Sequence, residues 1–278
     1  MGKKWLYGKN VIVTGASSGL GRGITKRLIE QYGCNVLGIA RSEDKLLALK
    51  NELGELSDRF DYKLFDVSSE DNWVTLADTL SVVSTAFKPD VLINNAGILP
   101  PFSRIENTTV ENMRHVMDIN FYSAVYATKH LLTILSKSTC PSIVNIASSS
   151  ALAPLPGTSI YTASKSALKG FTECMQCEPH ENTYIAIVCP GFTHTDIFRS
   201  QLVKTDENKL VNSLCMSCDK MVRKIVKGIA KRKRRMIFGL DAKAMDKLYR
   251  LMPRAAAKLF AKIMKVSKQD LFKDIFSD

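Results

Sequence analysis

Short apolar runs alternate along most of the chain with longer segments in which apolar residues recur every three or four positions. The short runs are typical of buried parallel strands, and the longer segments are typical of helices that cover a sheet. This pattern predicts strands at residues 11–13, 36–40, 62–65, 91–93, 143–146, 185–188 and 236–238.

The helices are predicted between these strands. They fall at residues 20–30, 44–53, 72–86, 110–135 and 161–176, and the segment 110–135 fits either one long helix or two. A strand–helix alternation of this kind predicts an α/β fold, with a doubly wound parallel sheet in a single domain over residues 1–240. Ligands of such sheets bind beyond the carboxyl ends of the strands.

The last part of the chain is strongly basic. Lys and Arg outnumber Asp and Glu by 18 to 6 in residues 219–278, which accounts for the whole net charge of +12. Apolar residues from Leu248 to Met264 recur at helical spacing between basic ones, so residues 241–278 are predicted to form a basic amphipathic helical extension packed on the same domain.

That extension has several possible roles. Residues 231–268 are candidates for contact with an anionic membrane surface, and the helix is equally suited to pack on a second subunit, cover a pocket mouth, or present a solvated face. The run Lys231–Arg235 has no aromatic residues interleaved for stacking on bases, so no nucleic acid is expected as a partner.

Other features of the sequence concern compartment and metals. No apolar stretch approaches the length of a membrane span, the first residues lack the apolar core of a signal peptide, and seven cysteines is an odd number. We therefore expect a cytoplasmic protein with reduced thiols. No metal is expected, because Cys174 and Cys177 fall in a predicted helix as buried thiols and Cys215 and Cys218 lack nearby Gly turns.

The candidate chemistry begins with Tyr161 and Lys165, which lie one helical turn apart in YTASK. Residues at this spacing share one face of a helix. A nearby ammonium favours the phenolate, so Lys165 is expected to lower the pKa of Tyr161. The pair is therefore a candidate general acid/base for alcohol and carbonyl chemistry.

A glycine-rich turn joins the first predicted strand to the first predicted helix. Gly15, Gly19 and Gly21 permit a tight turn, and the helix N-terminus that follows offers N–H groups and a positive dipole to a pyrophosphate. Taken alone, the same turn is also typical of a tight connection in any α/β protein.

Several short motifs occur together in a fixed order. They are TGASSGLG at 14–21, Asp66, NNAG at 94–97, Asn120, Ser148, YTASK at 161–165 and PGFTHT at 190–195. In order and spacing they resemble the short-chain dehydrogenase/reductase family over about the first 200 residues. The resemblance implies a Rossmann-type domain and an oxidoreductase that uses a nicotinamide cofactor.

The resemblance also implies cofactor contacts. The cofactor phosphates would lie on the turn formed by Gly15, Ser17, Ser18, Gly19, Leu20 and Gly21. Asp66 with Val67 resembles the adenine contact, and Asn94, Ala96 and Gly97 resemble the wall beside the adenosine ribose. Thr193 and Thr195, after Pro190 and Gly191, resemble the contacts to the nicotinamide carboxamide and phosphate.

Four residues resemble the catalytic set of the family. Ser148 would bond the substrate oxygen, Tyr161 would exchange a proton with it, Lys165 would bind the nicotinamide ribose, and Asn120 would hold a water that links Lys165 to solvent. The thirteen-residue gap to Tyr161 favours Ser148 over Ser149. The resemblance further implies a homodimer or homotetramer built through helices near 110–135 and 161–177.

Cofactor and substrate class follow from charge and polarity. Arg41 and Ser42 stand where an NAD-binding protein usually has an acidic residue, which predicts NADP as the cofactor.

Apolar residues within 192–221 predict an apolar small-molecule substrate. The chain also loosely resembles the 11β-hydroxysteroid dehydrogenase branch, which implies a steroid, a fatty ketone or a related lipid. The alternative is a nucleotide-binding adaptor at a membrane surface with a dehydrogenase-like fold.

Overall fold

The computed structural model describes residues 3–82, 87–180, 182–194, 215–267 and 272–276. Within these residues, seven strands form one sheet in the order β3-β2-β1-β4-β5-β6-β9, and every neighbouring pair is parallel. The strands are β1 Asn10–Thr14, β2 Asn35–Ala40, β3 Phe60–Leu64, β4 Val91–Asn94, β5 Ser142–Ile146, β6 Tyr184–Pro190 and β9 Arg235–Phe238. The predicted strands and the predicted parallel sheet are confirmed.

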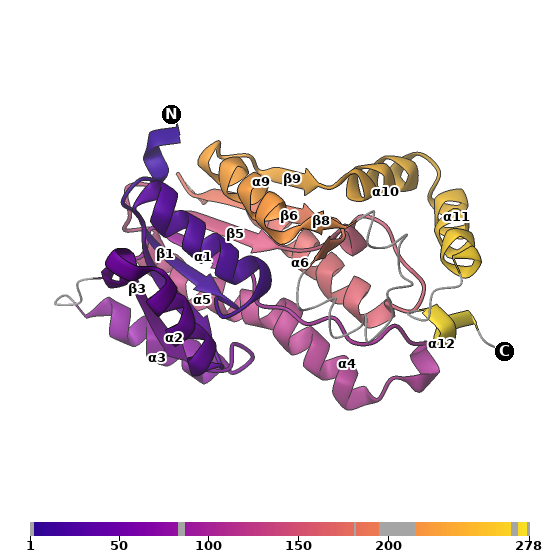
Figure 1. The fold of residues 1–278 in the computed structure, drawn as a ribbon, viewed down its shortest axis with the longest axis horizontal. Coiled ribbons are helices and arrows are strands. Elements are labelled where there is room, and N and C mark those ends of the chain that lie inside the picture. Colours follow the sequence, from indigo (N-terminus) through magenta and orange to yellow (C-terminus); the bar gives the residue numbers. More distant parts are fainter. Residues whose placement is uncertain (1–2, 83–86, 181, 195–214, 268–271, 277–278) are drawn as a thin grey trace.

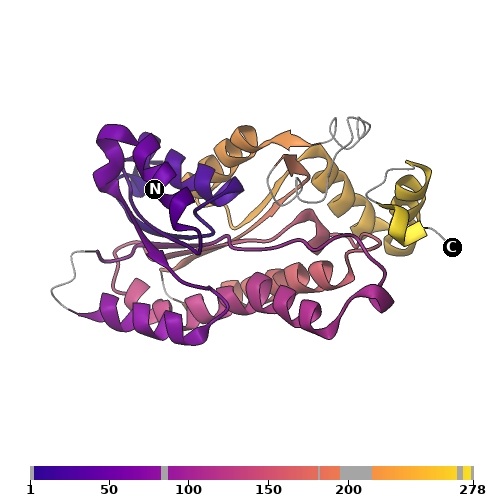
Figure 2. The ribbon, with the colours of Figure 1, turned by 60° about the horizontal axis from the view of Figure 1, so that its bottom comes forward.

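The helices cover both faces of the sheet (Figures 1 and 2). One face is covered by α1 Gly19–Tyr32, α2 Glu43–Glu52 and α9 Cys218–Ala230, and the other by α3 Glu70–Ser81, α5 Ser123–Leu135 and α6 Ser159–Cys177. Alternate strand residues enter opposite cores, since Val11 and Val13 join one apolar cluster and Ile12 joins the other. The two layers of helices explain why the central strands are apolar on both faces.

The predicted helical segment 110–135 is divided by a turn of π-helix. It consists of α4 Val110–Met117, the π turn Asp118–Tyr122, and α5. Such a turn inserts an extra residue into the helical ladder and often lies at a functional site. Here it carries Asn120.

Helix α9 lies outside the elements predicted from the sequence. Met221, Val222, Ile225, Val226 and Ile229 are buried along its inner side. Gly23 of α1 allows close packing, because a Cβ at that position would lie 2.8 Å from Val222 Cγ2. The helix therefore fills the α1 face of the sheet next to β9.

The carboxyl-terminal region is helical, but the single predicted helix from Leu248 to Met264 is wrong. The structure has α10 Leu240–Leu251 and α11 Pro253–Val266, followed by α12 Lys273–Phe276. The break falls at Met252, which has φ −142°, because a residue before proline disfavours the helical conformation. All three helices lie beyond the carboxyl ends of the strands (Figure 1). None of the helices described here is long and apolar enough to cross a membrane.

Shorter elements complete the fold. Turns of 3₁₀-helix span Lys3–Leu6, Gly54–Arg59, Ile105–Asn107 and Ser149–Ala151, and β7 Thr193–His194 pairs in parallel with β8 Met216–Ser217.

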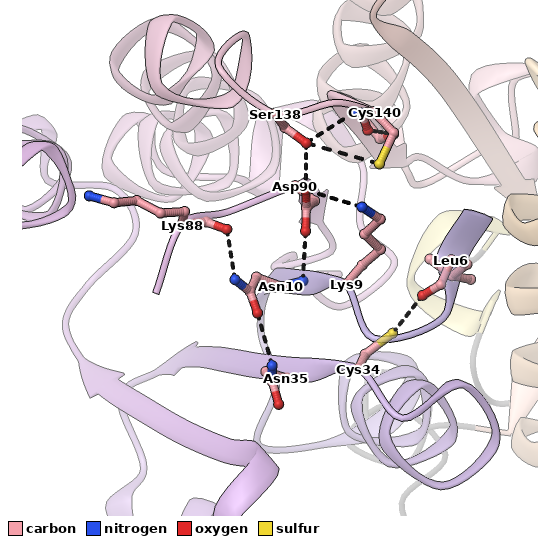
Figure 3. A network of polar contacts seen from close by, with 10 residues as sticks. Leu6, Lys9, Asn10, Cys34, Asn35, Lys88, Asp90, Ser138 and Cys140 are labelled. Atoms are coloured by element: carbon pink, nitrogen blue, oxygen red, sulfur yellow. Dashed lines mark hydrogen bonds and ion pairs between the residues drawn. The ribbon is translucent and has the colours of Figure 1, made fainter. Parts of the chain in front are cut away.

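A polar network ties the amino ends of the strands together (Figure 3). The carboxylate of Asp90 accepts the Asn10 N–H at 3.0 Å, lies 3.6 Å from Lys9 Nζ, and accepts the Ser138 hydroxyl. Asn35 Nδ2 donates to Asn10 Oδ1 at 3.0 Å. These bonds fix β1, β2, β4 and the segment before β5 relative to one another, which also aligns their carboxyl ends at the opposite edge.

Candidate active site

A pocket with a cavity volume of about 140 Å³ opens at the carboxyl edge of the sheet. Its walls come from the ends of β1, β4, β5 and β6 and from the first turns of α1 and α6. The lining residues are Gly15, Ser18, Gly19, Leu20, Asn95, Ala96, Gly97, Ile146, Ala147, Ser148, Tyr161, Lys165, Pro190, Gly191 and Thr193. The structure thus brings the glycine turn and the YTASK pair to one pocket.

The glycine turn has a backbone that side chains would obstruct. Gly15 and Gly19 have φ values of +67° and +50°, in the left-handed region that favours glycine. Gly21 does not line the pocket, and a Cβ on it would lie 2.1 Å from the Gly15 carbonyl oxygen. Gly21 therefore lets α1 pack against the turn, and the start of α1 faces the pocket through Ser18, Gly19 and Leu20.

Thr14 was not among the predicted site residues, and Asn95 was included only as part of the predicted ribose wall at Asn94 to Gly97. Thr14 Oγ1 accepts the backbone N–H groups of Asn95 and Ala96, both at 2.9 Å, and Asn95 Nδ2 donates to the Thr14 carbonyl at 2.9 Å. These bonds join the ends of β1 and β4, where the strand order reverses. Both residues belong to motifs visible in the sequence, TGASSGLG and NNAG.

The structure corrects the prediction that placed Asn94 in the pocket wall, because the Asn94 side chain lies in the core. Its Nδ2 donates to Asn145 Oδ1 at 2.8 Å, and the residue is 4% exposed. Asn94 is the last residue of β4, and successive side chains of a strand point to opposite faces. Asn95 takes the place in the pocket that the sequence interpretation gave to Asn94.

Ser148 and Tyr161 are neighbours in the pocket. Ser148 precedes the 3₁₀ turn Ser149–Ala151 and accepts the Ser150 N–H at 3.2 Å. Burial raises the pKa of the Tyr161 phenol, and a hydrogen bond with Ser148 acts in the opposite direction. Of the serines at 148–150, Ser148 is therefore the one whose hydroxyl acts on the Tyr161 phenol.

Lys165 is buried, and this changes the predicted electrostatics. Its side chain is 4% exposed and its Nζ donates to the Ile146 carbonyl at 3.2 Å. Burial lowers the pKa of Lys165 to about 8. The expected lowering of the Tyr161 pKa by Lys165 is wrong for this structure, because the cost of burying the phenolate dominates.

Asn120 lies close to Lys165. Its Oδ1 accepts the Ile98 N–H at 2.7 Å, and its Nδ2 donates to the Ile98 carbonyl at 2.9 Å and to Ser164 Oγ at 3.0 Å. A Cβ on Gly97 would lie 3.0 Å from Lys165 Nζ and 3.1 Å from Asn120 Oδ1. Gly97 thus leaves open the space between the two side chains.

Arg41 and Asp66 follow β2 and β3 and lie outside the pocket lining, with Ser42 and Val67 beside them. Arg41 Nη1 is 3.6 Å from Asp66 Oδ2, and both side chains are largely exposed. Burial opposes ionisation of Asp66, yet hydrogen bonds from Ser68 and the charge of Arg41 leave its pKa below the ordinary value. The structure therefore presents a cation and a carboxylate side by side at this end.

The remaining predicted cofactor contacts are Ser17, Pro190, Gly191, Thr193 and Thr195. Ser17 does not line the pocket, whereas Pro190, Gly191 and Thr193 do, and Thr193 Oγ1 donates to the Gly191 carbonyl at 2.9 Å. Thr195 lies outside the described residues.

The expected burial of Cys174 is wrong. Cys174 and Cys177 are both exposed, on the outer side of α6. In the part of the chain that the structure describes, no group of three His, Cys, Asp or Glu side chains is arranged to hold a metal ion.

A smaller cavity adjoins Tyr161. Its lining includes Leu99, Phe102, Leu155 and Phe192. An apolar cluster that contacts Tyr161 extends from Leu99 and Phe102 to the carboxyl-terminal region. Its members there are Met264 of α11, Phe272 just before α12, and Ile275 and Phe276 of α12. The acid/base candidate is therefore flanked by the pocket of the glycine turn on one side and by the apolar cluster on the other.

Comparison with known sequences gives consistent matches. A family model described as short chain dehydrogenase matches residues 9–206. The chain is 31% identical over 268 residues to the putative oxidoreductase SadH of Mycobacterium tuberculosis, which covers 91% of this chain and 94% of that protein. It is 33% identical over 195 residues to 3beta-hydroxysteroid dehydrogenase 2 of Eggerthella lenta, covering 69% of this chain and 74% of the relative.

The fold is shared with solved structures as well. A short-chain dehydrogenase from Sphingobium yanoikuyae, solved in complex with NADPH, superposes with a TM-score of 0.73 over 94% of this chain and 97% of that one, at 24% identity. That identity establishes the common fold and does not decide the cofactor. Taken with the family match and the pocket geometry, it identifies the chain as an oxidoreductase of the short-chain dehydrogenase/reductase family, with a fold that binds a nicotinamide dinucleotide.

Proposed function

We propose that the protein moves a hydride between NADP(H) and a carbonyl or secondary alcohol of an apolar small molecule. The observation that carries this proposal is the cluster of buried Ser148, partly buried Tyr161 and buried Lys165 in the wall of a pocket that begins at a glycine turn. The nicotinamide, when bound, would supply or accept the hydride. The protein's own residues must then hold the nucleotide, orient the substrate oxygen and move one proton.

The residues present fit the nucleotide. The start of α1 would hold the pyrophosphate through backbone N–H groups, because Gly15 and Gly19 allow close approach. Asp66 and Val67 would contact the adenine, Ala96 and Gly97 would flank the adenosine ribose, and Thr193 would contact the nicotinamide side. Lys165 would bind the second ribose.

Proton transfer is the task of Tyr161. With its pKa raised by burial, the phenol is neutral at neutral pH, which is the form that donates a proton to a carbonyl oxygen during reduction. Ser148 would donate a hydrogen bond to the same oxygen. Asn120, across Gly97 from Lys165, would support proton exchange with solvent.

The apolar substrate class is supported by the side of Tyr161 that faces away from the glycine turn. Leu99, Phe102 and Phe272 are buried there, and the rings of Phe102 and Phe272 lie edge to face at 5.3 Å. Burial of an apolar substrate on such a surface is favourable. Steroids and fatty ketones fit this chemistry, and one relative of the chain carries the name of a hydroxysteroid dehydrogenase.

We expect Tyr161→Phe to reduce turnover by about 10³-fold or more while NADPH binding stays within about twofold, because the proton donor is lost and the packing is kept. NADPH consumption would be followed with a panel of steroid, fatty and sugar ketones, and NADPH binding by fluorescence titration. Undiminished turnover in the variant would exclude Tyr161 as the acid.

Cofactor choice is expected to depend on Arg41. Arg41→Ala should weaken NADPH about tenfold by removing a charge-assisted contact to the 2′-phosphate, and should leave NADH affinity unchanged. Lys45→Ala, at an exposed cation on α2, serves as the matched control. Wild-type protein that binds NADH more tightly than NADPH would contradict the assignment.

The buried ammonium of Lys165 is expected to reduce stability below pH 8. Its pKa falls from 10.5 when unfolded to about 8 when folded. Between pH 8 and pH 10.5 the unfolded state binds more protons than the folded state, so the free energy of unfolding should rise with pH in this range. Compared with Lys165→Met, which has no ammonium, the wild type should gain about 3 kcal/mol. Urea denaturation of both proteins from pH 7 to 10.5, without nucleotide, measures this; a pH-independent difference between them would refute it.

The extension also supports a second role as a membrane-surface contact. On α11, Leu259, Ile263 and Val266 are 45%, 50% and 69% exposed at helical spacing, while Arg254, Lys258, Lys262 and Lys265 form a neighbouring basic stripe. Exposed apolar residues next to basic ones complement an anionic lipid surface. A nucleotide-binding adaptor would use this contact without catalysis.

Co-sedimentation with phosphatidylserine vesicles tests this role. We expect binding at low salt that weakens as salt rises, with a loss of at least threefold in L259Q/I263Q and in K258E/K262E. Equal binding to neutral vesicles, or none to anionic vesicles, would argue against the contact. Light scattering of the protein alone, without vesicles, would show whether it forms the homodimer or homotetramer that the family resemblance implies.

A further inference from the structure

Asp241 places its carboxylate inside the turn that follows β6. It is the second residue of α10, and its Oδ2 accepts the Phe192 N–H at 2.6 Å. A Cβ on Gly191 would lie 2.3 Å from both carboxylate oxygens, and a Cβ on Gly239 would lie 2.2 Å from Oδ1. The carboxylate therefore occupies space that side chains at these two glycines would need.

The carboxylate is held by backbone rather than by a cation. Its hydrogen bonds come from the N–H groups of Phe192, Ala242 and Asp241 itself, and burial raises its pKa against the effect of these bonds. Among the described residues it has no Lys, Arg or His within ion-pair distance. A partly buried acid without a counter-charge costs stability, so a gain elsewhere is expected.

The turn held by Asp241 separates the two parts of the proposed site. Gly191 lines both the nucleotide pocket and the apolar cavity beside Tyr161, and Phe192 lines the cavity. The Gly191 N–H donates to the Phe238 carbonyl at 2.7 Å, and the Gly191 carbonyl accepts the Thr193 hydroxyl at 2.9 Å. A shift of the Phe192 amide would move all of these groups.

We propose that Asp241 is a positioning residue for the nicotinamide end of the cofactor, acting through the turn Pro190–Thr193. This inference rests on the proposed function, and it assigns a role to a residue outside the segment 9–206 that matches the family. By this interaction α10, in the basic extension, completes the site that the preceding domain forms.

The test separates the two ends of the cofactor. Asp241→Ala should raise the dissociation constant of NADPH at least tenfold but leave that of adenosine 2′,5′-bisphosphate, which lacks the nicotinamide half, within twofold. Asp241→Asn keeps the volume and one acceptor, so a rise of about threefold for NADPH is expected. Asp246→Asn is the matched control on the same helix, since Asp246 pairs with Arg235 at 2.7 Å, away from the pocket.

Equal loss of affinity for both ligands in the Asp241 variants, or no loss for either, would overturn the inference. Hydrogen exchange in the protein without nucleotide gives a second readout, because the Phe192 amide should exchange at least tenfold faster in Asp241→Asn than in wild type. Unchanged exchange there would also overturn it. Wild-type protein that binds the bisphosphate and NADPH equally weakly would instead refute the proposed function.

Discussion

The burial of one ammonium group, that of Lys165, is the constraint around which the site is organised. Lys165 is 4% exposed and contacts the Ile146 carbonyl at 3.2 Å, with Gly97 leaving room for its Nζ. A buried cation is costly unless its surroundings offset the lost hydration. In this protein burial lowers its pKa to about 8, so the group sits near the boundary between charged and neutral at physiological pH. In the proposed function, the ribose of the bound nucleotide would supply hydroxyl oxygens to this ammonium.

The same burial reverses the role that local sequence gives to Tyr161. The i,i+4 spacing places the ammonium and the phenol on one helical face and favours the phenolate, but the loss of solvent around both groups has the larger effect. A neutral phenol bonded to Ser148 is suited to donate a proton to a carbonyl oxygen. In the proposed reaction, the neutral phenol is the form that donates a proton during reduction, and the phenolate is the form that accepts one during oxidation.

Helix α11 of the extension has one buried face and one exposed face. Ala256, Phe260 and Met264 of α11 are buried against the domain, and Met264 joins the apolar cluster that contacts Tyr161. Leu259, Ile263 and Val266 remain exposed beside the basic stripe. One helix thus closes the apolar side of the site while it offers a charged, apolar surface outward. Asp241 links the first helix of this extension to the turn between the two cavities.

The sequence by itself determined the strands, the parallel sheet and the motifs of the pocket, because apolar periodicity and glycine spacing are local properties of the chain. The sequence also contains the apolar spacing of α9, although the predicted elements do not include that helix. Tertiary structure decided that Asn95 rather than Asn94 faces the pocket and that Asp241 reaches Gly191, whereas the division of the basic helix at Pro253 is a local effect of proline that the sequence contains. The tertiary structure also decided the pKa of Tyr161 and of Lys165, since a group's exposure to water depends on residues distant in sequence that pack around it.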